Sequence, residues 1–209
     1  MRRSLLAILL LLAVPLAFAD GFKKAYFGAT KPGSWAKYTL KTSAGDMTSL
    51  YTRLADDDQG QARIEMRTEF SNKETPTSIN RYTLRKGFAL DRDLMDYGPG
   101  IVAGEMGIAG EVQPTDPATL AIIAKTLARY GANAKFLGSD TVAGKKCDRY
   151  SYTVRFPGDP EQIENGEIWL NDAVPFGLVK QKATTKDPGG KEISSYEETL
   201  VESGVGEAK

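Results

Sequence analysis

The protein has 209 residues, and its 27 lysines and arginines are balanced by 27 aspartates and glutamates, so the formal net charge is zero. This balance argues against a basic nucleic-acid-binding module, and the 41% hydrophobic and 26% charged composition is typical of a folded globular protein. The sequence contains no histidine, which removes the commonest general base and metal ligand and every His-based catalytic arrangement. A binding or carrier role is therefore favoured over an enzyme, and no cofactor is expected.

The first 19 residues are predicted to be a cleaved secretory signal peptide. Arg2 and Arg3 precede a leucine-rich apolar stretch, and Ala17-Phe18-Ala19 forms a cleavage site of the small-x-small type before Asp20. A membrane anchor is the alternative, but the apolar stretch falls short of the ~20 residues that cross a bilayer. Residues 20–209 are expected to form one soluble domain in the periplasm or outside the cell.

Alternating apolar and polar residues predict antiparallel strands through most of the mature chain. The clearest case is 62–70, where Ala62, Ile64 and Met66 share one face while charged residues occupy the other. The expected strands are 35–41, 47–54, 62–70, 78–85, 88–90, 135–142, 146–156, 163–170, 178–185 and 192–201. Short turns, such as Asp187-Pro188-Gly189-Gly190, separate them. About ten strands with short links indicate a strongly curved sheet or an incomplete β-barrel.

One helix and one glycine-rich segment are expected between two groups of strands. Asp116 suits the N-cap of a helix over 117–130, Pro117 suits its first turn, and apolar residues recur at helical spacing until Gly131. The preceding segment, 98–110, holds five glycines among apolar side chains, and we interpret it as a lid or an ordinary loop over the core edge. The predicted fold is α+β and mainly antiparallel β, covered by this helix and lid.

The predicted sheet offers more apolar surface than one helix can cover. Either the sheet closes on itself or a cavity remains that an apolar ligand can occupy. We expect a ligand-binding floor formed by Tyr38, Leu40, Ile64, Met66 and Phe70. The expected roof consists of Met106, Ile108, Ile123 and Leu127. The expected partner is a hydrophobic small molecule, a lipid or the acyl chains of a lipoprotein.

Three segments resemble bacterial exported proteins of the LolA-like superfamily, the family of the outer-membrane lipoprotein carrier. They are Gly-Ser-Trp-Ala-Lys-Tyr ending at Tyr38, the hairpin from Val142 to Tyr150, and the strand pair from Glu167 to Lys180. The resemblance implies a strongly curved antiparallel sheet whose hollow is closed by helices and accepts acyl chains or other hydrophobic groups. It also implies a periplasmic carrier or sensor of a lipid or lipoprotein.

A carbohydrate-active hydrolase with paired carboxylates is one rival interpretation. Asp91 or Asp93 would act together with Glu65 or Glu167. The cluster of Asp91, Asp93 and Asp96 does not match a calcium-binding loop, because the glycine and glutamate positions of that loop are occupied by other residues.

An envelope scaffold is the other rival interpretation. In this case a sheet edge or the outer sheet face would dock a protein partner, and Lys180, Lys182 and Glu197 would form an exposed charged patch. The sequence alone leaves the carrier, the hydrolase and the scaffold open.

Overall fold

The computed structural model describes residues 22, 26, 29–43, 45–72, 74–86, 100–156 and 160–208. These residues contain eleven strands and one helix. Their bounds are β1 Ser34–Thr42, β2 Gly45–Leu54, β3 Ala62–Phe70, β4 Ser78–Leu84, β5 Ile101–Ile108, β6 Glu111–Pro114, α1 Pro117–Ala132, β7 Lys135–Val142, β8 Lys145–Phe156, β9 Gln162–Leu170, β10 Leu178–Lys186 and β11 Glu192–Val205. The predicted signal segment and the predicted strand 88–90 lie outside the described residues.

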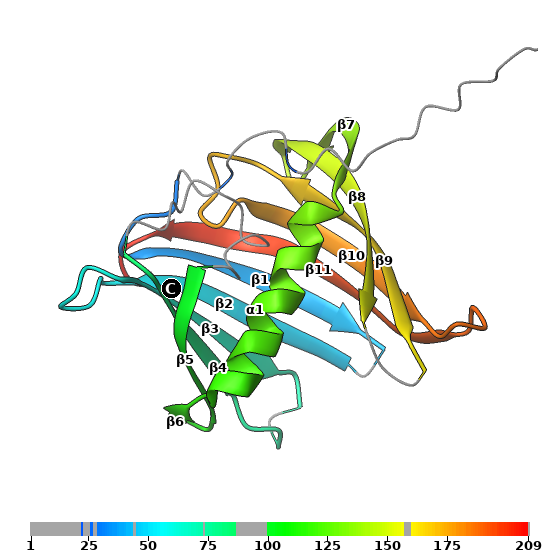
Figure 1. Ribbon diagram of the computed structural model, residues 1–209. Coiled ribbons are helices and arrows are strands. Elements are labelled where there is room, and N and C mark those ends of the chain that lie inside the picture. The colour runs from blue at the N-terminus through cyan, green and yellow to red at the C-terminus, as the bar shows by residue number, and fades with distance from the viewer. Residues whose placement is uncertain are drawn as a thin grey trace, which may run out of the picture.

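The eleven described strands form one antiparallel sheet in the order β6-β5-β4-β3-β2-β1-β11-β10-β9-β8-β7. This order consists of two meanders, β1 to β6 and β7 to β11, in which each strand pairs with its neighbour in the chain. The meanders are joined where β1 pairs with β11, so the first and last strands lie side by side in the middle of the sheet (Figure 1). The sheet is open, with β6 and β7 at its two edges. The predicted curved, mainly antiparallel fold is therefore confirmed.

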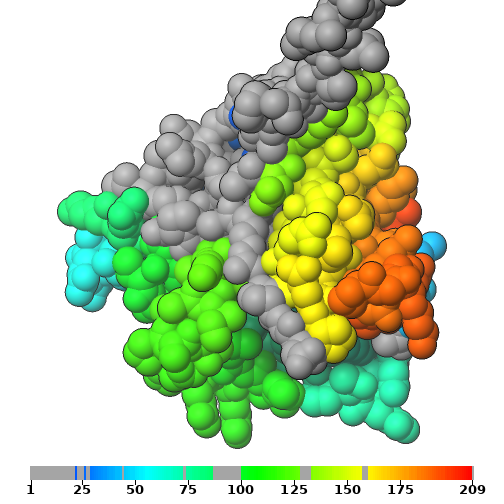
Figure 2. Space-filling view, turned by 45° about the vertical axis from the view of Figure 1, so that its right-hand side comes forward, coloured from blue at the N-terminus to red at the C-terminus, as the bar shows by residue number. Residues whose placement is uncertain are grey.

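Helix α1 connects the two edge strands and crosses the hollow side of the curved sheet (Figure 1). Its main contacts are with β5 and β8, which are separated by seven strands in the sheet order. The helix begins as predicted, because the Asp116 carboxylate accepts hydrogen bonds from the backbone N–H groups of Ala118 and Thr119, both at 3.0 Å. The helix therefore bridges two distant parts of the sheet. In the space-filling view, the green region that includes the β5–β6 hairpin and the start of α1 lies to one side, and yellow β8 lies to the other (Figure 2).

The predicted glycine-rich lid is wrong for residues 101–108, which form strand β5 and pair with β4. The glycines here allow close approach rather than motion. A Cβ atom on Gly104 would lie 2.8 Å from Leu120 Cδ1, and one on Gly107 would lie 1.9 Å from the carbonyl oxygen of Glu111. Gly110 has a φ of +93° in the turn between β5 and β6, a conformation that favours glycine. The sequence analysis interpreted these glycines as a sign of a flexible segment.

The strand register divides the side chains between two faces of the sheet. Because Gly104 lies against Leu120 of α1, the residues in register with Gly104 define the inner face, which α1 crosses. Tyr82 and Ile64 belong to this inner face, since Gly104 pairs with Tyr82 and Tyr82 pairs with Ile64. Side chains alternate along each strand, so the residues between the inner-face positions point to the opposite side and form the outer face. The core lies on the inner face, where aromatic and aliphatic side chains from both meanders meet α1.

Candidate functional site

The inner face carries the predicted floor residues on neighbouring strands. Tyr38 and Leu40 come from β1, and Ile64, Met66 and Phe70 come from β3. The pairing of β1 and of β3 with β2 places all five side chains on this one face. Tyr38 and Ile64 are fully buried in the core, whereas the other three are half-buried. Their contact with a ligand stays a prediction.

The apolar side of α1 covers part of the inner face. Ile123 and Leu127, both predicted to belong to the roof, pack against the buried core together with Leu120. Their 3.6-residue periodicity, read from the sequence, identified the correct side of this helix. Ile122, by contrast, points away from the core and is 68% exposed. The helix therefore turns one apolar side toward the inner face.

Met106 and Ile108 were predicted to form part of the roof, and this placement is wrong. Both residues lie on β5 and face the same side as the floor, since Met106 pairs with Asn80 and Ile108 pairs with Ser78. Their side chains are 41% and 58% exposed, respectively. They follow Gly104, which lies against Leu120 of α1, along β5. We call these two exposed apolar residues, Met106 and Ile108, the β5 margin.

A buried carboxyl group lies on the inner face near the junction of the two meanders. Glu198 of β11 is only 6% exposed, and one of its oxygens accepts a hydrogen bond of 3.1 Å from the Tyr51 hydroxyl. Burial raises the pKa of Glu198 to about 7, although the hydrogen bond from Tyr51 opposes this rise. Burial, and then the Glu198 charge, also raise the pKa of Tyr38. The centre of the inner face is therefore a site where burial favours the neutral carboxyl group.

A second polar group on the inner face is a hydrogen-bonded cluster of four residues. The Gln181 side-chain amide donates hydrogen bonds of 2.7 Å to the hydroxyls of both Tyr152 and Tyr196. The Tyr152 hydroxyl in turn donates to a Glu164 oxygen at 3.1 Å. We call Glu164, Gln181, Tyr152 and Tyr196 the inner polar cluster. Its members satisfy one another, which is the condition for polar groups to be retained in a core.

Gly166 determines where Tyr152 lies in the inner polar cluster. A Cβ atom on Gly166 would lie 2.3 Å from the Tyr152 phenol oxygen, so the ring covers the α-carbon of this glycine directly. Such packing of an aromatic ring over a strand glycine restores the buried surface that the glycine lacks. The absence of a side chain at position 166 therefore allows Tyr152 to reach Gln181 and Glu164.

The outer face carries ion pairs, and these include the glutamates proposed for a hydrolase. Glu65 is paired with Arg81 at 2.7 Å, and Glu167 is paired with Arg149 at 2.5 Å and Lys182 at 2.8 Å. Burial opposes ionisation of Glu167, but its bonds to Lys182 and Arg149 outweigh burial and lower its pKa. A general acid needs the opposite shift.

The aspartates of the hydrolase interpretation, Asp91 and Asp93, lie outside the described residues, as does Asp96. Among the residues that the structure does describe, no group of three or more His, Cys, Asp or Glu side chains is arranged to hold a metal ion. Within the same part of the chain, no helix has both the length and the apolar character needed to cross a membrane.

Sequence reasoning missed the buried polar residues of the inner face. Glu164, Gln181 and Glu198 occupy inner positions in strands that also place Ile168, Ala183 and Leu200 on the inner face, so they break the alternation. That break was the available signal, because a polar residue at a buried strand position requires a partner. The partners Tyr51 and Tyr196 come from strands that only the register brings near.

Comparison with known proteins gives remote structural likenesses only. No protein-family model matches the chain, and no curated protein matches it. LprF from Mycobacterium bovis matches with 14% identity over 88% of this chain and 91% of its own, at a TM-score of 0.40. MucB, in the Pseudomonas aeruginosa MucA/MucB complex, matches with 12% identity over 88% of this chain and 56% of its own, also at 0.40. This chain therefore spans about half of the MucB length. Because both scores are low, neither match decides fold or function, and the LolA-like resemblance stays a prediction.

Proposed function

We propose that the protein is an exported binding or carrier protein that holds a lipid, an acyl chain or another hydrophobic group, without a covalent bond, between the inner face and α1. The observation that carries this proposal is the apolar inner face that packs against α1, together with the exposed β5 margin, which lies on the same face of the sheet beyond Asn80 and Ser78. Clusters of exposed apolar residues at the edge of a concave surface are typical of ligand entrances.

The span of α1 supports the proposal. A helix that contacts chiefly β5 and β8, at distant places in the sheet, bridges the curved sheet rather than packing along it. Small movements of such a helix change the volume beneath it without breaking strand pairing. A ligand that enters there gains roughly 0.8 kcal/mol for each methylene group that leaves water, before the cost of association.

The β5 margin allows a direct test with the hydrophobic fluorescent probe 1-N-phenylnaphthylamine. Met106→Asp places a charge on the inner face at the β5 margin, and we expect at least tenfold weaker probe binding because charged groups are costly to desolvate. Val201→Asp is the matched control, since Val201 is an exposed apolar strand residue, 58% against 41%, but lies at the bulge of β11, next to Glu202, which pairs with Lys37 of the outer face. This control should bind the probe as the wild type does.

Two results would contradict the proposal. The first is that the wild-type protein, purified under native conditions, neither binds the probe nor releases a lipid on organic extraction. The second is that Met106→Asp and Val201→Asp bind the probe equally well while both remain folded by circular dichroism.

A further inference from the structure

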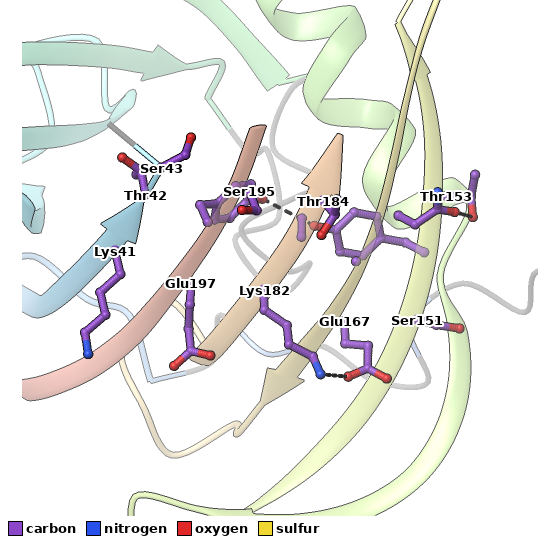
Figure 3. Close-up of a pocket in the computed structure, with 15 residues that line it drawn as sticks. Lys41, Thr42, Ser43, Ser151, Thr153, Glu167, Lys182, Thr184, Ser195 and Glu197 are labelled. Carbon is purple, nitrogen blue, oxygen red and sulfur yellow. Dashed lines mark hydrogen bonds and ion pairs between the residues drawn. The ribbon is translucent and has the colours of Figure 1, made fainter. Parts of the chain in front are cut away.

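The outer face has a groove that the proposed ligand site does not use. It crosses the end of β1 and the strands β11, β10, β9 and β8 and has a volume of about 750 Å³. This volume lies within the range of small-molecule sites, roughly 300–1,000 Å³. Figure 3 shows its side chains, which come from both meanders.

Two parallel rows of side chains build the groove. The strand register aligns residues from neighbouring strands into a charged row. Two residues further along the strands, it aligns an uncharged row on the same face. The charged row is Lys41, Glu197, Lys182 and Glu167. The hydroxyl row is Ser195, Thr184, Asn165 and Thr153. Long side chains in the first row and short ones in the second leave the space between them hollow (Figure 3).

Three of the four side chains of the charged row, Glu197, Lys182 and Glu167, take part in ion pairs. Lys182 is paired with Glu167 at 2.8 Å (Figure 3), and Glu197 is paired with Lys180 of the adjacent row at 3.0 Å. Lys182 also lies 5.5 Å from the centre of the Trp169 ring, which is buried beside it. Side chains that are already ordered lose little conformational entropy when a ligand binds. The charged row is therefore a preorganised wall.

The hydroxyl row has unused hydrogen-bonding capacity. Within the described part of the chain, the hydroxyls of Ser195 and Thr184 form no side-chain hydrogen bond, whereas the Thr153 hydroxyl donates to the Asn165 carbonyl oxygen at 2.8 Å. That bond leaves the Asn165 amide free to donate. The hydroxyl row therefore presents hydrogen-bond donors and acceptors to a ligand in the groove.

We infer that this groove binds a neutral oligosaccharide. The charged row holds two lysines and two glutamates rather than charges of a single sign, and the hydroxyl row offers hydrogen bonds that an acyl chain cannot use. The side chains of the hydroxyl row repeat at the spacing of neighbouring strands, about 4.8 Å, and the sugar rings of an extended glycan repeat at a similar interval. A glycan lying across the strands presents hydroxyl groups to each position of the row. Lysine and glutamate on the wall are suited to hydrogen bonds with sugar hydroxyls.

The test uses isothermal titration of the full mature chain with chitohexaose, cellohexaose and maltohexaose. At least one probe should bind, and the double variant Thr184→Val with Ser195→Ala should weaken that binding about tenfold, because two hydrogen bonds are lost. Thr199→Val is the matched control, since Thr199 lies on the outer face beside Lys180, outside the groove. NMR shift mapping should place the bound probe on the amides of β9, β10 and β11 that border the groove.

Several results would overturn this inference. These are binding of none of the three probes at millimolar concentration, equal affinity of the double variant and Thr199→Val, and binding of dextran sulfate alone, which would indicate a polyanion. A cross-linked protein partner in the groove that no glycan displaces would instead favour a protein-docking surface. Loss of binding in Met106→Asp would show that the probe occupies the inner site.

Discussion

Carboxylates on the two faces of the sheet occupy opposite environments. On the inner face, Glu198 is almost fully buried, its partner is the Tyr51 hydroxyl, and burial raises its pKa to about 7. On the outer face, Glu167 lies between Arg149 and Lys182, and its pKa is lowered. The inner carboxyl group is therefore buried beside a neutral hydroxyl, whereas the outer one is held between two cations. Substitutions on the inner face should cost much more stability than those on the outer face.

The largest expected effect is that of Gly166→Ala on the inner face. The added methyl group would overlap the Tyr152 ring and displace it from Gln181 and Glu164, which would leave buried polar groups without partners. Overpacking and lost hydrogen bonds together should lower the free energy of unfolding by about 4 kcal/mol. Urea denaturation measures this change. Gly189→Ala, in the β10–β11 turn, is the control and should change stability by less than about 0.5 kcal/mol. Similar values for the two variants would refute the packing of Tyr152 over Gly166.

The second-largest expected effect is the dependence of the free energy of unfolding on pH that the Glu198 carboxyl causes. Its pKa rises from an ordinary 4.5 to about 7 on folding, so the unfolded chain loses this proton first as pH increases. The stability that this carboxyl contributes is therefore fully present below about pH 4.5. It is lost as the pH rises to 7, which lowers the free energy of unfolding by on the order of 3 kcal/mol. Glu198→Gln should remove that part of the pH dependence in urea titrations at pH 5 and pH 8.

Glu197→Gln is the matched control for the pH experiment, because Glu197 is the neighbouring residue on the outer face and is paired with Lys180. This variant should keep the wild-type dependence on pH. Identical slopes for wild type and Glu198→Gln would mean that the inner carboxyl is hydrated in solution, and the contrast between the faces would then be lost.

The smallest effect is expected on the outer face. Lys182→Met removes the ion pair with Glu167 but keeps most of the aliphatic side chain, which is half exposed. Exposed ion pairs contribute little, so the free energy of unfolding should fall by less than about 1 kcal/mol, and 1 M salt should reduce the difference further. A loss comparable to that of Gly166→Ala would indicate that the outer row supports the fold as strongly as the inner face does.

The sequence was most informative where structure depends on neighbouring residues. Strand 62–70 has the predicted bounds because its alternation is local, and α1 begins at Pro117 because Asp116 caps it locally. The apolar floor of the site followed from the same alternation. The sequence failed at β5, whose glycines are required by contacts with β6 and α1 that no local pattern reveals.

The inner polar cluster and the outer groove were also beyond local reasoning. Gln181, Tyr152 and Tyr196 come from three strands, and only the completed register brings their side chains together. The hydroxyl row likewise exists only once β8 to β11 are aligned. The antiparallel pairing of successive strands was predictable from their short links, but their exact register and the pairing of β1 with β11 were not.

The pairing of β1 with β11 has a consequence for how the chain reaches its native state. Each meander can assemble from successive hairpins as synthesis proceeds, but the seam between the meanders must wait until the last strand has emerged. Until then, β1 presents an open edge that can recruit another chain. A chaperone that shields this edge, or rapid completion of the C-terminal strand, would limit aggregation during biogenesis.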